Sequence, residues 1–158
     1  MLKITITDSG FTQKLEGLVA RIEDAKPAMQ SIGEILISDT LAAFDAGGLP
    51  EPWQPIVGGG KPLQGSGRLR GSYDLETTPN SATVTWGSGL IYAAVQQFGA
   101  TIKAKNVPHL KFRIGNRWAS KKQVTIPARR YLRFRDPAVE KINELLGQYL
   151  INDTRGEI

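Results

Sequence analysis

The glycine-rich run at residues 58–61 (Gly-Gly-Gly-Lys) is the first candidate for chemistry, because such loops can wrap around the phosphates of a nucleotide. Two neighbouring positions argue against that use. Pro62 stands where a serine or threonine would reach the magnesium ion, and Pro55 stands where the first glycine of the motif is required. No clear strand precedes the loop either. We therefore do not expect this segment to bind a nucleotide.

The other groups that could support catalysis are isolated in the sequence. His109 is the one histidine, there are no cysteines, and the residues around it include no carboxylates that could complete a zinc site. Asp39 and Asp45 fall beside apolar stripes of an expected helix, where solvated faces are usual. No serine stands in the strand–turn–helix setting that exposes a nucleophile. The sequence therefore predicts no catalytic residue, no metal ligand and no cofactor, and we expect a protein that is not an enzyme.

Positive charge is concentrated in one part of the chain. The whole sequence carries a net charge of +5, yet the stretch from Lys103 to Arg135 holds eleven lysines and arginines and no acid. Such a block suggests an anionic partner, either DNA or an acidic protein surface. A solvated hairpin with alternate residues pointing to water is the simpler alternative. The candidate contact residues are Lys111, Arg113, Arg117, Trp118, Lys121 and Lys122.

The elements that would position these residues indicate an α+β fold with an N-terminal helical pair, an antiparallel sheet with a long projecting hairpin, and a C-terminal helix. The 158 residues suit one domain, 1–158. Alternation predicts a short strand at 2–7, and apolar spacing predicts helices at 11–22 and from Pro27 to Ala46. Asp136 and Pro137 begin the last helix, and residues 152–158 are expected to form a loose tail.

The middle of the chain is expected to be built from loops and hairpins. Residues 47–67 are rich in glycine and proline and predict a long loop, anchored by burial of Trp53. Alternation predicts a hairpin at 72–86 and a basic hairpin at 103–126, and the apolar run between them, ended by Gly99, predicts a short helix at 90–98. A turn at Gly115 would place Phe112 opposite Ala119. Like charges crowded on these paired strands are expected to repel one another.

Three short segments, together with a tryptophan–proline region at Trp53, carry a resemblance to a known family. The first has the pattern L-x-x-S-G-x-L-x-x-S and the second Y-A followed by glycine six residues later. The third has P-A-R-x-[FY]-L. The residues concerned are Leu63, Ser66, Gly67, Leu69, Ser72, Tyr92, Ala93, Phe98, Gly99, Pro127, Ala128, Arg129, Tyr131 and Leu132. In this order they resemble the phage virion morphogenesis, or tail completion, family of Mu-like phages and prophages.

The resemblance implies a structural protein that acts in tail completion or head–tail joining, as a ring of identical copies. Its implied partners are other copies, other phage tail or neck proteins, and packaged DNA bound without sequence preference. It implies assembly in the host cytoplasm followed by incorporation into the virion. No apolar stretch approaches the length of a membrane span, so no membrane partner is expected. The alternative is a free nucleic-acid-binding protein that uses the basic hairpin with Trp118 and Phe112.

The motif residues also have expected physical roles in the fold. Leu69 and Tyr73 are expected to enter the core after the turn at Gly67. Tyr92 and Phe98 are expected to pack on the sheet from the short helix. Tyr131 and Leu132 are expected to dock the chain before the last helix. All of these roles are structural, as expected of a protein selected for its shape and interfaces.

Overall fold

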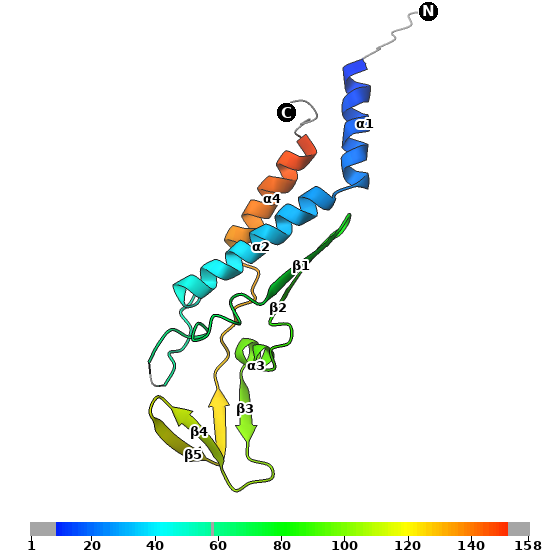
Figure 1. Ribbon diagram of the computed structural model, residues 1–158. Helices are drawn as coiled ribbons and strands as arrows, with labels where there is room; N and C mark the ends of the chain where they lie inside the picture. Colours follow the sequence, from blue (N-terminus) through cyan, green and yellow to red (C-terminus); the bar gives the residue numbers. More distant parts are fainter. Residues whose placement is uncertain (1–8, 58, 152–158) are drawn as a thin grey trace, which may run out of the picture.

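The computed structural model describes residues 9–57 and 59–151, with side chains from residue 13 onward. Within these ranges it contains helices and antiparallel strand pairs, with two helices at the N-terminal side and one at the C-terminal side. The α+β prediction is therefore confirmed. The strand expected at 2–7 and the tail expected at 152–158 lie outside the described residues. Figure 1 shows an elongated molecule, with the helices at one end and a hairpin at the other.

The N-terminal helical pair forms where the apolar spacing predicts it. Helix α1 runs from Ser9–Glu23 and helix α2 from Lys26–Ala46, with a proline in the first turn of α2. Gly47 ends α2 in a left-handed conformation with φ of 76°. Its backbone N–H donates to the carbonyl of Phe44, and that of Gly48 donates to Ala43. This pattern satisfies carbonyls that a helix end otherwise leaves without donors.

Two elements pack along α2. The hairpin of β1 (Tyr73–Thr78) and β2 (Ser81–Trp86) lies against it, and α4 (Asp136–Ile151) runs beside it (Figure 1). Gly33 allows the hairpin to approach closely, because a Cβ atom there would collide with the side chain of Leu75. Arg135, which lies just before α4, forms an ion pair with Asp39 of α2. Its Nε donates to Oδ2 of Asp39 at 2.9 Å, and one of its terminal nitrogens donates to Oδ1. Helix α2 is therefore the common support of the upper part of the fold.

An aromatic cluster forms the centre of the core. Phe44 is fully buried and its ring centroid lies 5.4 Å from that of Trp53, 6.0 Å from Trp86 and 5.5 Å from Tyr131. The indole N–H of Trp53 donates to the carbonyl of Arg130 at 3.3 Å. Trp53 is buried, as predicted. Its ring holds the segment after α2 against the end of that helix.

The strands do not form the single sheet that was expected, but pair two by two. Short helix α3 (Ala93–Phe98) leads into β3 (Ala100–Lys103), which pairs with β6 (Gln123–Ile126), and between them lies the hairpin of β4 (Leu110–Ile114) and β5 (Arg117–Lys121). With β1–β2 this gives three separate antiparallel pairs. The predicted pairing of Phe112 with Ala119 is confirmed. Strand β3 was not predicted, because four residues give too little alternation to identify.

Candidate assembly surfaces

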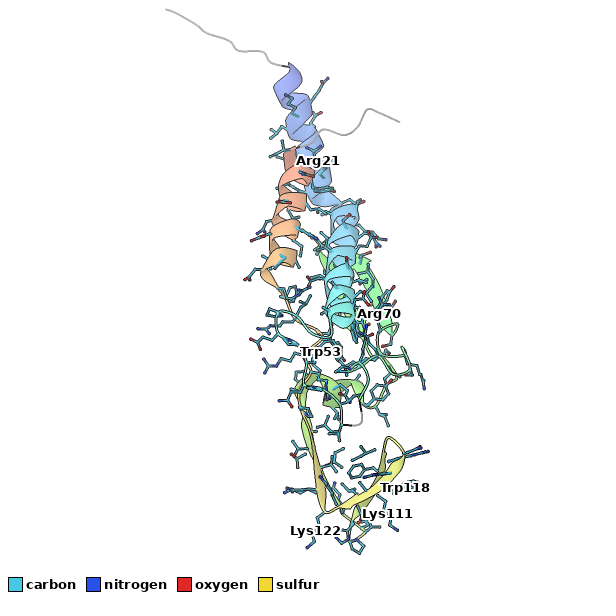
Figure 2. All side chains as sticks on the ribbon, turned by 90° about the vertical axis from the view of Figure 1, so that its left-hand side faces the viewer. Arg21, Trp53, Arg70, Lys111, Trp118 and Lys122 are labelled. Atoms are coloured by element: carbon cyan, nitrogen blue, oxygen red, sulfur yellow. The ribbon has the colours of Figure 1, made fainter. Side chains whose placement is uncertain are left out.

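The β4–β5 hairpin carries the predicted basic residues to the end of the molecule opposite the helices, as the labelled Lys111, Trp118 and Lys122 show (Figure 2). The pairing staggers the cations. Lys111 lies opposite Ser120, and Arg113 lies opposite Trp118. The expected crowding of like charges across the two strands is therefore wrong, because each charged residue of β4 and β5 faces an uncharged partner.

Strand alternation divides the hairpin into two unlike faces. Lys111, Arg113 and Trp118 share one face, and Trp118 is 77% exposed there. Arg117 and Lys121 belong to the face that also holds the half-buried apolar side chains of the hairpin. Lys122 follows β5 and is exposed. An exposed indole on the same face as two cations suits either phosphates with stacked bases or an acidic protein surface.

The three motif segments meet at the aromatic core. Leu69, Ala93 and Tyr131, one from each segment, are all buried. The hydroxyl of Tyr131 donates to the carbonyl of Ala93 at 3.2 Å, and the indole N–H of Trp86 donates to the carbonyl of Leu69 at 2.7 Å. Burial raises the pKa of the Tyr131 hydroxyl, so this donor keeps its proton well above neutral pH. The motifs therefore join segments that are distant in the sequence.

Other motif residues shape the backbone around that core. The hydroxyl of Ser72 donates to the carbonyl of Leu69 at 2.7 Å and accepts the backbone N–H of Gly87 at 3.1 Å. Gly99 has φ of 73°, and a Cβ atom there would stand 2.8 Å from the backbone nitrogen of Ala128. Only glycine fits at that crossing. The remaining motif positions are turn or surface residues: Ser66, Gly67 and Ala128 are exposed, and Leu63 and Pro127 are half-buried.

The packing expected of Phe98, Tyr92 and Tyr73 is wrong, and that of Leu132 holds only in part. Phe98 is 74% exposed and Tyr92 is 36% exposed, and residues six apart on a helix could not both have packed on the sheet. Ala93 and Gln97, four apart, point inward instead. Tyr73 is 44% exposed although its ring lies 5.0 Å from that of Trp86, and it borders the core instead of entering it. Leu132 is also only partly covered, at 36% exposed.

Gln97 is a structural residue that the sequence interpretation missed. Its amide nitrogen donates to the carbonyl of Leu132 at 2.8 Å, and its amide oxygen accepts the backbone N–H groups of Tyr131 and Leu132, both at 3.0 Å. One side chain thereby satisfies three backbone groups of a segment without regular structure. The available signal was a pair of glutamines, Gln96 and Gln97, in an otherwise apolar short helix.

Arg129 of the third motif is a charged residue that the fold buries. It is 5% exposed, and burial lowers the pKa of its guanidinium from the ordinary value. Nε donates to the carbonyl of Gln54 at 3.1 Å, and a terminal nitrogen donates to Oε1 of Gln96 at 3.2 Å. Both acceptors are uncharged. Arg129 thus ties the long loop to α3 while retaining a positive charge inside the protein.

Apolar surface is exposed at two further places. Helix α1 presents Leu15, Val19 and Ile22, which are 50%, 48% and 62% exposed and share one helical face. Between α2, β2 and the chain before α4 lies a mostly apolar groove of about 460 Å³, with Phe134 at 75% exposure on its rim. The apolar face predicted for α1 is therefore only partly covered by the other residues that the structure describes.

The described residues include no group of three histidines, cysteines or carboxylates that could hold a metal ion. None of the helices within the described ranges is long and apolar enough to cross a membrane. His109 and Lys61 are exposed, and residue 58 of the glycine run lies outside the described residues. What the geometry does assemble is a set of surfaces that can contact other molecules.

A family model for phage virion morphogenesis matches residues 6–151, nearly the whole chain. The chain belongs to the phage virion morphogenesis family. Family membership assigns it to the building of phage virions, and it suggests a structural role in place of a catalytic one. No curated protein and no solved structure matches the chain.

Proposed function

We propose that this member of the phage virion morphogenesis family is a structural, non-catalytic part of tail completion or head–tail joining that works as a ring of identical copies. The observation that carries the proposal is the apolar surface left exposed on α1 and in the groove at Phe134. Each surface is apolar enough to favour burial, and the two differ in shape. A closed ring requires such a pair, because one patch of each copy meets a different patch of the next.

Charge supports the pairing of these two surfaces. Glu16 and Glu23 lie seven residues apart on α1, beside the apolar stripe, and both are exposed. The groove is lined by an exposed arginine, Arg133, next to Phe134. A helix that lays Leu15, Val19 and Ile22 into the groove would bring acids near that arginine. Opposite charges at the rim of an apolar contact set its register and orientation.

The basic hairpin would then contact another component at the joint. Its cations lie at the end of the molecule opposite α1, so a ring built through the upper surfaces leaves them free for another partner (Figure 1). Packaged DNA in the ring lumen and an acidic face of an adjacent virion protein both satisfy this charge. A lumen contact would involve phosphates and would carry no sequence preference.

Reversing four hairpin charges, in a Lys111→Glu, Arg113→Glu, Lys121→Glu, Lys122→Glu variant, is expected to block particle joining while leaving the fold intact. All four side chains are exposed and none makes an ion pair with a described residue, so the monomer loses little. The measurement is complementation of a phage that lacks the protein, with circular dichroism to check folding. The wild-type gene should restore infectious particles, and the variant should leave unjoined heads and tails.

A matched control shows whether the position of the charges in the hairpin, or the change in net charge alone, causes the effect. Reversing Lys26, Lys61, Arg68 and Lys141, which are exposed elsewhere, makes the same change in net charge. This control variant should restore particle yield to near the wild-type level. Normal particle yield from the folded hairpin variant would contradict the proposed role and would leave the hairpin as a solvated face.

The alternative of a free nucleic-acid-binding protein is favoured by one observation, the exposed Trp118 on the same face as Lys111 and Arg113. Such a protein would bind single strands as a monomer, with an affinity that falls steeply as salt is added. Stacking predicts that Trp118→Ala weakens this binding. A ring that meets DNA only through phosphates would lose little with the same change.

A further inference from the structure

The cavity beneath Arg129 has the features of a binding site that the fold itself does not fill. It has a volume of about 230 Å³, and all three motif segments contribute to its walls. Its polar lining comes from Ser66, Tyr92, Gln96 and Arg129, apolar side chains including Leu63 line the rest, and the site stays open to solvent. Leu63 holds φ of 63°, a left-handed conformation that costs a leucine energy and that tends to occur at functional sites.

The charge in this cavity has no counterion within the described part of the chain. The ion pairs formed there join Arg70 with Asp45 and Arg135 with Asp39, and no described carboxylate reaches Arg129. Its Nε and one terminal nitrogen donate to Gln54 and Gln96, and no acceptor among the described residues reaches the other terminal nitrogen. That nitrogen is not among the fully enclosed atoms without a partner, so it keeps some access to solvent, and Arg129 lines the cavity. A buried charge without a counterion is costly, and an incoming anion relieves that cost.

We infer that this cavity receives a carboxylate side chain from a neighbouring copy of the chain, which pairs with the Arg129 guanidinium. The inference rests on the proposed ring and adds a specific polar contact to it. An arginine already held at two nitrogens presents a fixed donor to a carboxylate, so little side-chain freedom is lost on binding. The apolar side chains of the walls can contact the methylene groups of a glutamate or aspartate stem.

The distribution of acids points to another copy as the source. No aspartate or glutamate occurs between Glu76 and Asp136, the part of the chain that contains Arg129. Exposed acids lie instead on α1, α2, β1 and α4 and at Glu51 of the loop after α2. A contact that joins different surfaces of adjacent copies can bring one of these acids to the basic part of the next. The charge separation within one chain therefore complements itself between chains.

Carbodiimide cross-linking of an Arg129→Lys variant tests the inference directly, because the reagent joins an amine only to a carboxylate in contact with it. The variant keeps the positive charge and adds an amine in the cavity. Mixed isotope-labelled and unlabelled copies distinguish links between copies from links within one. Arg130→Lys, at the exposed neighbouring position, is the control. We expect a link from position 129 to an aspartate or glutamate of another copy, with a much weaker link from position 130.

A second variant measures the contribution of the contact. Arg129→Gln should raise the dissociation constant of the assembly by at least about 30-fold, as expected when one partner of a buried charge pair is removed. Denaturant unfolding of the monomer shows whether the variant still folds. Failure of the link between copies, or a link confined to one copy, in a protein that still forms rings would overturn this inference alone. A wild-type chain that stays monomeric would overturn the ring and this contact together.

Discussion

Replacing Phe44 with alanine is expected to lower the free energy of unfolding by about 3–5 kcal/mol, the range for truncating a fully buried aromatic side chain. Phe44 is 0% exposed and contacts the rings of Trp53, Trp86 and Tyr131. The cavity left behind is bounded by large rings that cannot easily collapse into it. Trp53→Ala, which removes the facing ring, should have an effect of similar size. Urea unfolding of the separated monomer measures both changes.

Phe98→Ala is the matched control for this prediction. It removes the same side chain from a position that is 74% exposed, so the unfolding free energy should change by no more than about 0.5 kcal/mol. Equal effects at Phe44 and Phe98 would show that the aromatic cluster is not the centre of the core. A large loss of assembly in Phe98→Ala, without a loss of monomer stability, would instead place Phe98 in a contact between copies.

Removing one partner of the Arg135–Asp39 pair is the second large change. Their side chains are 15% and 13% exposed, and the guanidinium also donates to the Asp39 carbonyl at 2.9 Å. Asp39→Ala leaves the arginine without its counterion in a nearly enclosed site. Loss of a fully buried partner costs about 3–5 kcal/mol, and the remaining solvent contact reduces our expectation to about 2–4 kcal/mol. Because the pair holds α4 against α2, the helical circular-dichroism signal should also be lost at a lower temperature than in the wild type.

The exposed pair Arg70–Asp45 provides the comparison. Its side chains are 40% and 63% exposed, and its geometry is again that of an arginine fork on a carboxylate. Asp45→Ala should cost less than about 1 kcal/mol, since exposed ion pairs contribute little. Raising the salt concentration should reduce the effect at Asp45 more than the effect at Asp39. Equal losses at the two sites would contradict the structural role assigned to Arg135.

The sequence predicted best those features that depend on local signals. The proline at the start of α2 and the glycine at its end mark that helix, and the turn at Gly115 sets the register of β4 and β5. Burial of Trp53 followed from an aromatic residue in a glycine-rich loop. Each of these inferences uses neighbouring residues only, so no knowledge of distant contacts was needed.

The features that failed depend on contacts between distant segments. Outward exposure of Phe98 follows from the way Gln97 binds the segment at Leu132, 35 residues later. The isolated charge of Arg129 depends on which carboxylates the fold brings near it. Strand β3 exists because β6 returns to pair with it, and its four residues carry little pattern of their own. The role of each candidate contact residue likewise depends on partners outside the chain.

Native mass spectrometry of the purified protein tests the central claim most directly, namely that copies join through the α1 stripe into a ring. We predict one dominant species whose mass is a fixed multiple of the chain mass and does not grow further with concentration. Val19→Glu, which puts a charge in the stripe, should reduce it to monomer, and Gln13→Glu, on another face of α1, should not. A wild-type protein that remains monomeric at every concentration would contradict the account.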